Sequence, residues 1–116
     1  MLRKNKYHNI KVYVGGEQYD SRKESKRAIE LGLMARGGLI RDLRRQVPFV
    51  LQEGYTSNQG AKVRPIYYNA DFVYFDVERN MWVVEDVKSP ATRTQVYKLK
   101  KKLFEAKYRE YLFLET

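Results

Sequence analysis

The sequence contains no cysteine and only one histidine, His8, and these two shortages exclude several kinds of site. Without thiols there is no disulfide, no thiolate zinc ligand and no cysteine nucleophile, which fits a reducing cytoplasm. One histidine cannot build the ligand clusters of catalytic zinc. A bound metal would therefore need oxygen ligands, which favour Mg²⁺ or Mn²⁺.

Long apolar runs are also missing from the chain. No segment is apolar for long enough to span a membrane, and the basic start MLRKNKYHNIK is not followed by the hydrophobic stretch of a secretory signal. There is no repeat, and Pro, Gly and Ser do not gather into a linker. The sequence therefore predicts a single domain, 1–116, with a basic arm at 1–9 that stays flexible until it meets DNA.

Acidic residues are outnumbered by basic ones. The chain has 23 Lys and Arg against 14 Asp and Glu, a net charge of +9. A small domain with this charge attracts polyanions, and counterion release favours binding to nucleic acid. A basic charge that serves only solubility is the alternative.

The hydrophobic pattern predicts elements in the order β, α, β, β, β, α, β. The expected elements are a strand at 10–14, a helix from Ser21 to about 36, strands at 47–53, 64–76 and 81–88, a helix at 94–108 and a strand at 109–115. Residues 17–21 are expected to lead into the first helix and 54–62 to form a loop. This order predicts a mixed α/β (α+β) fold, with helices flanking a central sheet.

Two acids and a lysine lie in strands whose other residues are suited to burial. Alternation places Asp86 and Lys88 on one face of the strand 81–88, and Glu85 on the other, in a surface or pairing role. A tight turn brings Asp71 of the preceding strand opposite them. Neighbouring carboxylates repel each other unless a cation bridges them, so the pattern indicates a divalent metal site. A buried Asp–Lys ion pair is the alternative.

A third acid, Glu24, lies on the first helix. Its spacing from Ala28, Leu31 and Ala35 places it on the stripe that faces the sheet. Ser21 and Glu24 also match the S-x-x-E capping box, in which both side chains satisfy backbone donors at the helix start. The two roles are compatible, and the sequence leaves both open.

The last helix is basic and amphipathic. Its buried stripe is expected to consist of Val96, Leu99, Leu103 and Ala106. The residues outside it, with the basic residues of the first helix, are expected to contact phosphates. These candidates are Arg22, Lys23, Lys26, Arg27, Tyr97, Lys98, Lys101 and Lys102. A solvated charged face is the alternative.

These features together resemble the PD-(D/E)XK nuclease superfamily. An acid on the first helix is followed by AD inside a strand and by EDVKS at the end of the next one. The resemblance places Asp71 at the first acid of the motif, residues 86–88 at D-x-K and Glu24 at the helix acid. Ala70 replaces the proline of the motif.

A second stretch, RRQVPFVL, resembles the start of a strand in the nuclease subunit of heteromeric transposases, and places Gln46 in the site. The whole pattern is similar to a small phage and prophage family of uncharacterised, resolvase-like proteins. The resemblance implies a restriction-endonuclease-like αβββαβ core. It also implies that Asp71, Asp86 and the Val87 carbonyl bind Mg²⁺ or Mn²⁺, with Glu24 completing the shell or holding a second ion.

In that family the lysine of D-x-K, here Lys88, positions the attacking water. The implied function is a metal-dependent endonuclease for branched or duplex DNA, similar to a Holliday-junction resolvase, acting as a homodimer in the bacterial cytoplasm during phage recombination or replication. A nicking or exonucleolytic phage nuclease is one alternative. A catalytically silent DNA-binding module is another.

Overall fold

The computed structural model describes the backbone of residues 12–14, 17–19 and 21–116, and side chains from residue 21 onward. Its elements are β1 (Val12–Val14), β2 (Glu17–Tyr19), α1 (Arg22–Arg36), β3 (Ile40–Gln52), β4 (Tyr55–Thr56), β5 (Lys62–Val63), β6 (Ile66–Asp76), β7 (Met81–Asp86), α2 (Gln95–Lys107) and β8 (Tyr111–Glu115). The predicted basic arm, 1–9, lies outside the described residues.

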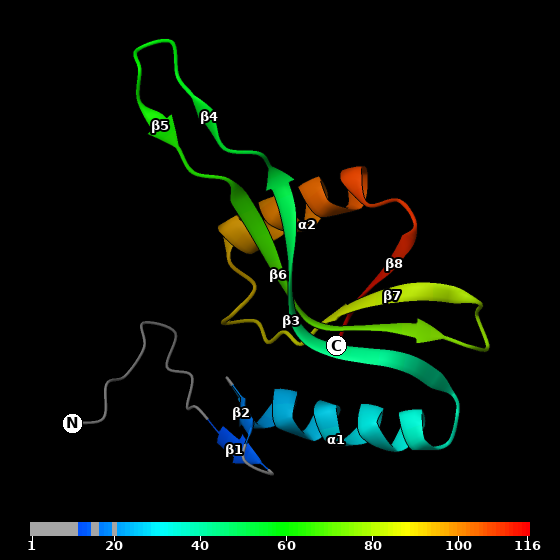
Figure 1. Ribbon diagram of the computed structural model, residues 1–116. Helices are drawn as coiled ribbons and strands as arrows, with labels where there is room; N and C mark the ends of the chain where they lie inside the picture. Colours follow the sequence, from blue (N-terminus) through cyan, green and yellow to red (C-terminus); the bar gives the residue numbers. More distant parts are fainter. Residues whose placement is uncertain (1–11, 15–16, 20) are drawn as a thin grey trace.

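Four strands form the central sheet in the order β3–β6–β7–β8 (Figure 1). Strand β8 runs parallel to β7, whereas the β3–β6 and β6–β7 pairs are antiparallel. The parallel pair follows from the helix α2, which carries the chain from the end of β7 back to the start of β8. The predicted mixed α/β fold is confirmed.

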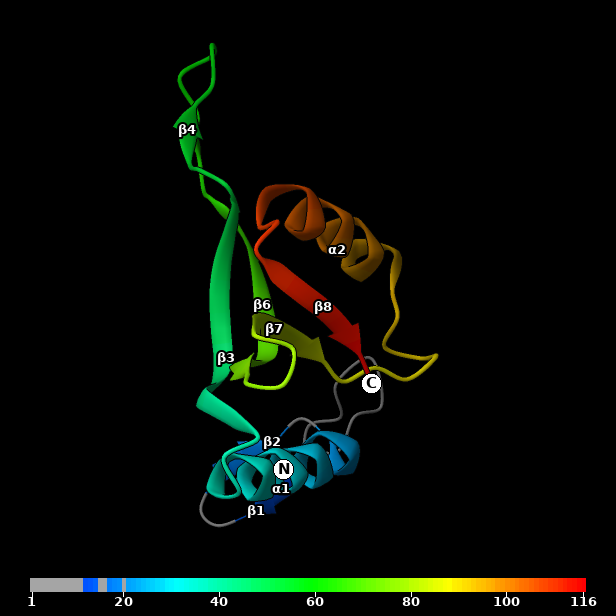
Figure 2. The ribbon, with the colours of Figure 1, turned by 90° about the vertical axis from the view of Figure 1, so that its right-hand side faces the viewer.

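The two helices cover opposite faces of the sheet (Figure 2). Neighbouring strand residues point to opposite faces, so Val83 packs on the α1 side and Val84 on the α2 side. The α1-side core consists of Leu31, Ile40, Phe72, Tyr74 and Val83. The α2-side core consists of Phe49, Tyr68, Ala70, Val73, Val84, Tyr97 and Phe104. The end of β7 therefore lies between two packed layers.

Helix α1 begins and ends where the sequence predicts. The Ser21 side chain accepts a hydrogen bond of 3.1 Å from the Glu24 N–H, and Gly37 follows the last turn. Leu31 is fully buried, and Ala28 and Ala35 pack on the same α1-side core. Neither this helix nor α2 has the length and apolar character needed to cross a membrane, and the described part of the chain has no other helix.

Strand β3 begins at Ile40 rather than at the predicted residue 47. The polar stretch 41–46 continues the strand because it pairs with the far half of β6, including Arg41 opposite Phe75. Within this first half, Ile40 and Leu43 pack on the α1-side core. Because charged residues surround these two apolar positions, the strand pattern is not visible in the sequence.

Two short hairpins differ from the predicted connections. Residues 17–19 form β2 and pair with β1, although the sequence predicts only a lead into α1. The predicted loop 54–62 contains β4 and most of the β4–β5 hairpin. This second hairpin continues the β3–β6 pair outward from the domain (Figure 1).

The buried side of α2 also differs from the prediction. Tyr97 and Phe104 are 7% and 0% exposed, and the Phe104 ring packs against Phe49 and Tyr108 at centroid distances of 5.0 and 5.1 Å. Aromatic rings bury more surface than aliphatic side chains, so they occupy the side that faces the sheet. The residues predicted to be buried are exposed instead: Val96, Leu99, Leu103 and Ala106.

Candidate functional site

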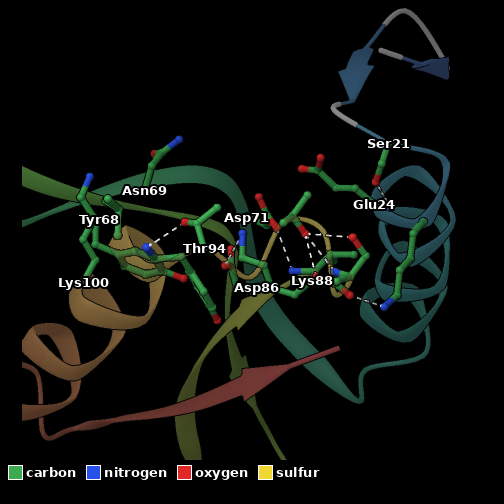
Figure 3. A pocket seen from close by; sticks show the side chains of 15 residues that line it. Ser21, Glu24, Tyr68, Asn69, Asp71, Asp86, Lys88, Thr94 and Lys100 are labelled. Carbon is green, nitrogen blue, oxygen red and sulfur yellow. Dashed lines mark hydrogen bonds and ion pairs between the residues drawn. The ribbon is translucent and has the colours of Figure 1, made fainter. Parts of the chain in front are cut away.

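A pocket of about 400 Å³ opens at the end of β7, between the first turns of α1 and α2 (Figure 3). The N-cap residues of both helices, Ser21 and Thr94, line it. It also brings together five of the six predicted catalytic and metal-binding residues: Glu24, Asp71, Asp86, Val87 and Lys88. Residues that are up to 79 positions apart in the chain, from Ser21 to Lys100, thus share one cavity.

The pairing of β6 with β7 places Asp71 beside Asp86, as the sequence predicts. The last pair of this ladder is Phe72 opposite Glu85, so Asp71 and Asp86 are one step further along the two strands. The Val87 N–H donates a hydrogen bond of 2.8 Å to Oδ2 of Asp71, which holds this carboxylate against the end of β7. Asp86 itself is only 2% exposed.

A break in the alternation of β6 turns Asp71 towards the pocket. Ala70 and Val73 both pack on the α2-side core, although a regular strand would place residues separated by three positions on opposite faces. Phe72, between them, packs on the α1-side core. The faces of β6 therefore exchange between Ala70 and Phe72, at Asp71, which lines the pocket.

The partner strand β3 changes at the same level, at Gln46. This residue has φ +51°, in the left-handed region, where a non-glycine residue costs about 1–3 kcal/mol. Val47 packs on the α2-side core, whereas Arg45 pairs with Phe72 on the other face. The strained backbone is maintained next to the carboxylates, where it directs the Gln46 side chain towards them.

The Gln46 side chain links three residues of the site. Its Nε2 donates hydrogen bonds to Oε1 of Glu24 at 2.9 Å and to Oδ1 of Asp71 at 3.3 Å. Its Oε1 accepts a hydrogen bond of 2.6 Å from Nδ2 of Asn69. Because Asn69 donates to the oxygen, the amide nitrogen of Gln46 is directed at the two acids.

Glu24 reaches the site from α1, on the opposite side of the sheet from α2 (Figure 3). It is 2% exposed, and Arg45 Nη2 lies 3.7 Å from its Oε1. The Ser21 half of the predicted capping box is present, and the Glu24 carboxylate also accepts from Gln46. The backbone N–H of Glu24 thus takes part in the helix start, whereas its carboxylate takes part in the site.

The ammonium group of Lys88 forms an ion pair with Asp86. Its Nζ lies 3.0 Å from Oδ2 of Asp86 and 4.3 Å from the centre of the Tyr97 ring. The Lys88 N–H bonds to the carbonyl of Thr116, and its own carbonyl accepts from Nζ of Lys23 at 2.6 Å. The lysine is thus fixed by its backbone and by the ring, and its ammonium group partly offsets the charge of Asp86.

The surroundings of Asp71 disfavour its charged form. Burial raises the pKa of its carboxyl to about 8, with repulsion from Asp86 and then from Glu24 adding to the shift. The hydrogen bond from the Val87 N–H opposes this shift but does not cancel it. A cation beside Asp71 would favour the charged carboxylate and relieve the repulsion.

The donor set of the pocket fits a hard divalent ion in part. Asp71 and Asp86 supply carboxylate oxygens, and Mg²⁺ is often bound by one or two carboxylates with water and phosphate oxygens in the other positions. Among the described residues, no three His, Cys, Asp or Glu side chains group in a way that could hold one metal ion. Glu24, behind Gln46, is therefore placed as a neighbour of the two-carboxylate site.

The predicted phosphate-contacting residues divide into two groups. Arg22, Lys23, Lys26, Lys98 and Lys102 are exposed. Three others are occupied within the domain: Tyr97 is buried and donates to Glu115, Lys101 lies 3.5 Å from Glu115, and Arg27 pairs with Glu85. The expectation that Tyr97 lies on the exposed face is wrong, and Glu85 has the pairing role rather than the surface role.

Several pocket residues were not predicted from the sequence, among them Tyr68, Asn69 and Lys100. Lys100 lies at the edge of the pocket on α2, and Asn69 orients Gln46. The Tyr68 hydroxyl is buried near Asp86, and burial followed by the Asp86 charge raises the pKa of Tyr68. Lys100 offers no signal, but Tyr68 and Asn69 directly precede the AD stretch, and this proximity could have marked them.

A protein-family model described as a protein of unknown function, DUF1064, matches residues 4–114. The chain belongs to the DUF1064 family. The match spans both helices and almost all of the central sheet, so the pocket of Asp71, Asp86 and Lys88 lies within the segment that defines the family. No curated protein and no solved structure matches the chain.

Proposed function

We propose that this DUF1064 protein is a divalent-metal-dependent nuclease that hydrolyses phosphodiester bonds in DNA. One observation carries the proposal: Asp71 and Asp86 adjoin at the floor of a pocket, with the Lys88 ammonium group 3.0 Å from Asp86. This combination of residues, in this order along the chain, resembles the PD-(D/E)XK nucleases. An Asp–Lys ion pair accounts for Asp86 alone, since among the described residues no lysine or arginine forms an ion pair with Asp71, whose pKa is raised.

Each residue has a separate role in this proposal. Asp71, Asp86 and the Val87 carbonyl would hold Mg²⁺ or Mn²⁺, which supplies Lewis-acid activation of a phosphate. Lys88 would orient the attacking water or balance the charge that develops on the phosphate. Gln46 and Glu24 would keep the Asp71 carboxylate in position through the hydrogen bonds of the Gln46 amide.

The surroundings of the pocket suit a phosphodiester backbone. The first turns of α1 and α2 both open onto it, and the positive ends of helices favour phosphate groups. Lys23 and Lys100 lie at its edge. We expect recognition of the DNA backbone and shape, with branched DNA as the substrate and a homodimer making the two opposed cuts. A catalytically silent DNA-binding module would not need the costly carboxylate pair.

The decisive experiment is cleavage of labelled four-way junction, flap, linear duplex and single-stranded DNA by the purified protein. We expect cleavage with Mg²⁺ or Mn²⁺ and none in EDTA, with the junction cut fastest. Cutting that starts at DNA ends would indicate the exonuclease alternative. Binding without cleavage of any of these substrates in either metal would refute the nuclease proposal.

Replacing Glu24 with glutamine tests its two roles. Glutamine can also close a capping box, so the helix start should survive and the melting temperature should change little. The substitution removes the charge that fixes Gln46, and we expect the cleavage rate to fall about 10- to 100-fold, as for residues that orient metal ligands. A Ser21→Ala variant, which removes the cap and keeps the carboxylate, should lose about 1 kcal/mol of stability but much less cleavage rate than Glu24→Gln. Full activity in Glu24→Gln would leave Glu24 with the capping role alone.

The exposed lysines of α2 should contribute affinity rather than chemistry. In the double variant Lys98→Ala/Lys102→Ala, the slope of log affinity against log salt for duplex DNA should fall by about 0.9 for each lost phosphate contact. The single-turnover rate at saturating protein should stay the same. The control Arg36→Ala/Arg79→Ala removes the same amount of charge outside α2. Arg36 lies in the last turn of α1, and Arg79 lies in the turn between β6 and β7. Equal slopes for the two variants would show that α2 does not contact phosphates.

A further inference from the structure

The hairpin of residues 53–65 projects from the domain at the end of the β3–β6 pair. We call this hairpin the arm from here on; it is distinct from the basic N-terminal segment 1–9. Figures 1 and 2 show it pointing away from the helices and from the rest of the sheet. In the described part of the chain, β4 and β5 form a separate two-stranded sheet. Most of its side chains are exposed. The arm therefore contributes little to either core.

The arm is nevertheless a specified structure. At its tip the Ser57 N–H donates to the Ala61 carbonyl at 2.8 Å, and the Ala61 N–H donates to the Ser57 hydroxyl at 3.1 Å. Gly60 has φ +84°, which a residue with a side chain rarely adopts. At the base, a Cβ on Gly54 would lie 3.0 Å from the Val63 carbonyl oxygen, so a residue with a side chain would require the backbone there to shift. Isolated two-stranded ribbons are marginally stable, and these features compensate for the missing core contacts.

The chemistry of the arm suits a polyanion. Beyond Glu53 at its base, the arm contains no acid and carries two bases, Lys62 and Arg64, both exposed. The tip carries the amides of Asn58 and Gln59, both exposed. Cationic and amide side chains are the ones that contact phosphates and base edges in DNA complexes.

We propose that the arm binds duplex DNA by lying in a groove, about one helical turn away from the pocket. The major groove of B-DNA accommodates a two-stranded β-ribbon. Strand β6 leads from Asp71 straight into the arm, and at about 3.3 Å per residue the chain from Gln59 to Asp71 spans at most ~40 Å. One turn of DNA is about 34–36 Å long. The idea that one duplex reaches from the pocket to the arm rests on the proposed function. Contact between the arm and duplex DNA can be tested without cleavage.

The absence of cysteine from the chain allows a direct test. Gln59→Cys carries a single photoreactive phenyl azide at the tip, and Arg79→Cys carries the same group on the β6–β7 turn. Each protein is irradiated in EDTA with a linear duplex of about 40 base pairs, roughly four helical turns. We expect a protein–DNA cross-link from Gln59→Cys that is several-fold stronger than that from Arg79→Cys. Equal cross-linking from both positions, or none from Gln59→Cys, would overturn the proposal.

The same gel shows whether the arm contacts a second copy of the chain instead of DNA. A protein–protein cross-link from Gln59→Cys that forms equally well without DNA would mean that the arm contacts a second copy of the chain, and it would also overturn the proposal. As an independent measurement, Lys62→Ala/Arg64→Ala should lower the salt slope of duplex binding by about 1.8, for two contacts, relative to the Arg36→Ala/Arg79→Ala control. An unchanged slope would contradict the proposed contact between the arm and duplex DNA.

Failure of the arm and failure of the nuclease proposal give different results. If the protein cleaves DNA but Gln59→Cys forms no cross-link, the nuclease proposal holds and the proposal that the arm binds DNA fails. The cross-link without cleavage in Mg²⁺ or Mn²⁺ leaves the arm as a duplex-binding element and removes the nuclease.

Discussion

Replacing Asp71 with asparagine is expected to slow DNA cleavage by about 1000-fold, since a lost metal ligand forfeits several kcal/mol of transition-state stabilisation. Affinity for DNA should stay the same or increase, because a negative charge facing the phosphate is removed. Single-turnover cleavage and binding in EDTA measure the two quantities. The control Asp42→Asn changes an exposed acid of β3 and should match the parent in both. Cleavage at the parental rate in Asp71→Asn would exclude this residue as a ligand.

The same substitution should change how stability depends on pH. The pKa of Asp71 is raised to about 8 in the folded protein, above the ordinary value of 3.8, so the folded state binds this proton more tightly than the unfolded state. Its contribution to stability is present below pH ~4 and is lost as the pH rises towards about 8. The neighbours Asp86, Glu24 and Lys88 stay in place in the variant.

Melting measured without metal from pH 4 to 8 tests this dependence. Asp71→Asn should flatten the fall in melting temperature and should be more stable than the parent at pH 8. Addition of Mg²⁺ or Mn²⁺ should stabilise the parent and have little effect on the variant, because binding to the folded state alone raises stability. Parallel pH profiles for the two proteins would contradict the raised pKa.

Replacing Arg27 with alanine is expected to lower the free energy of unfolding by about 3–5 kcal/mol, which is typical when one partner of a buried ion pair is removed. Glu85 is 0% exposed, and its Oε1 accepts 2.9 Å and 2.8 Å hydrogen bonds from Arg27 Nη2 and the Tyr74 hydroxyl. Without Arg27 this carboxylate stays buried between α1 and the sheet without its cation.

Urea unfolding at pH 7 measures this loss, with Lys26→Ala as the control. Lys26 is exposed on the same helix, and its substitution should change stability by no more than about 0.5 kcal/mol. The double variant Arg27→Met/Glu85→Met should recover most of the loss, since apolar replacement of a whole buried pair is often neutral. A loss below about 1 kcal/mol in Arg27→Ala would show that this pair does not hold α1 on the sheet.

Periodicity alone was sufficient for much of the site. The alternation of apolar residues in 81–88 and the tight turn before it predicted that Asp71 meets Asp86 and Lys88, because strand pairing is a short-range consequence of the turn. The N-cap at Ser21 and the inward direction of Glu24 follow from local helix geometry in the same way. These features depend on residues that are near one another in the chain.

Features that depend on packing between distant elements required the tertiary structure. Helix α2 has two stripes of apolar residues that both fit a 3.6-residue period. The aromatic stripe is buried because the Phe104 ring packs against Phe49 and Tyr68, on the sheet face that α2 covers. The exchange of faces at Ala70 and Asp71 occurs together with the left-handed backbone of Gln46 on the neighbouring strand. No local pattern encodes a distortion that two strands share, so the amide contact between Gln46, Glu24 and Asp71 emerged only when the strands were paired.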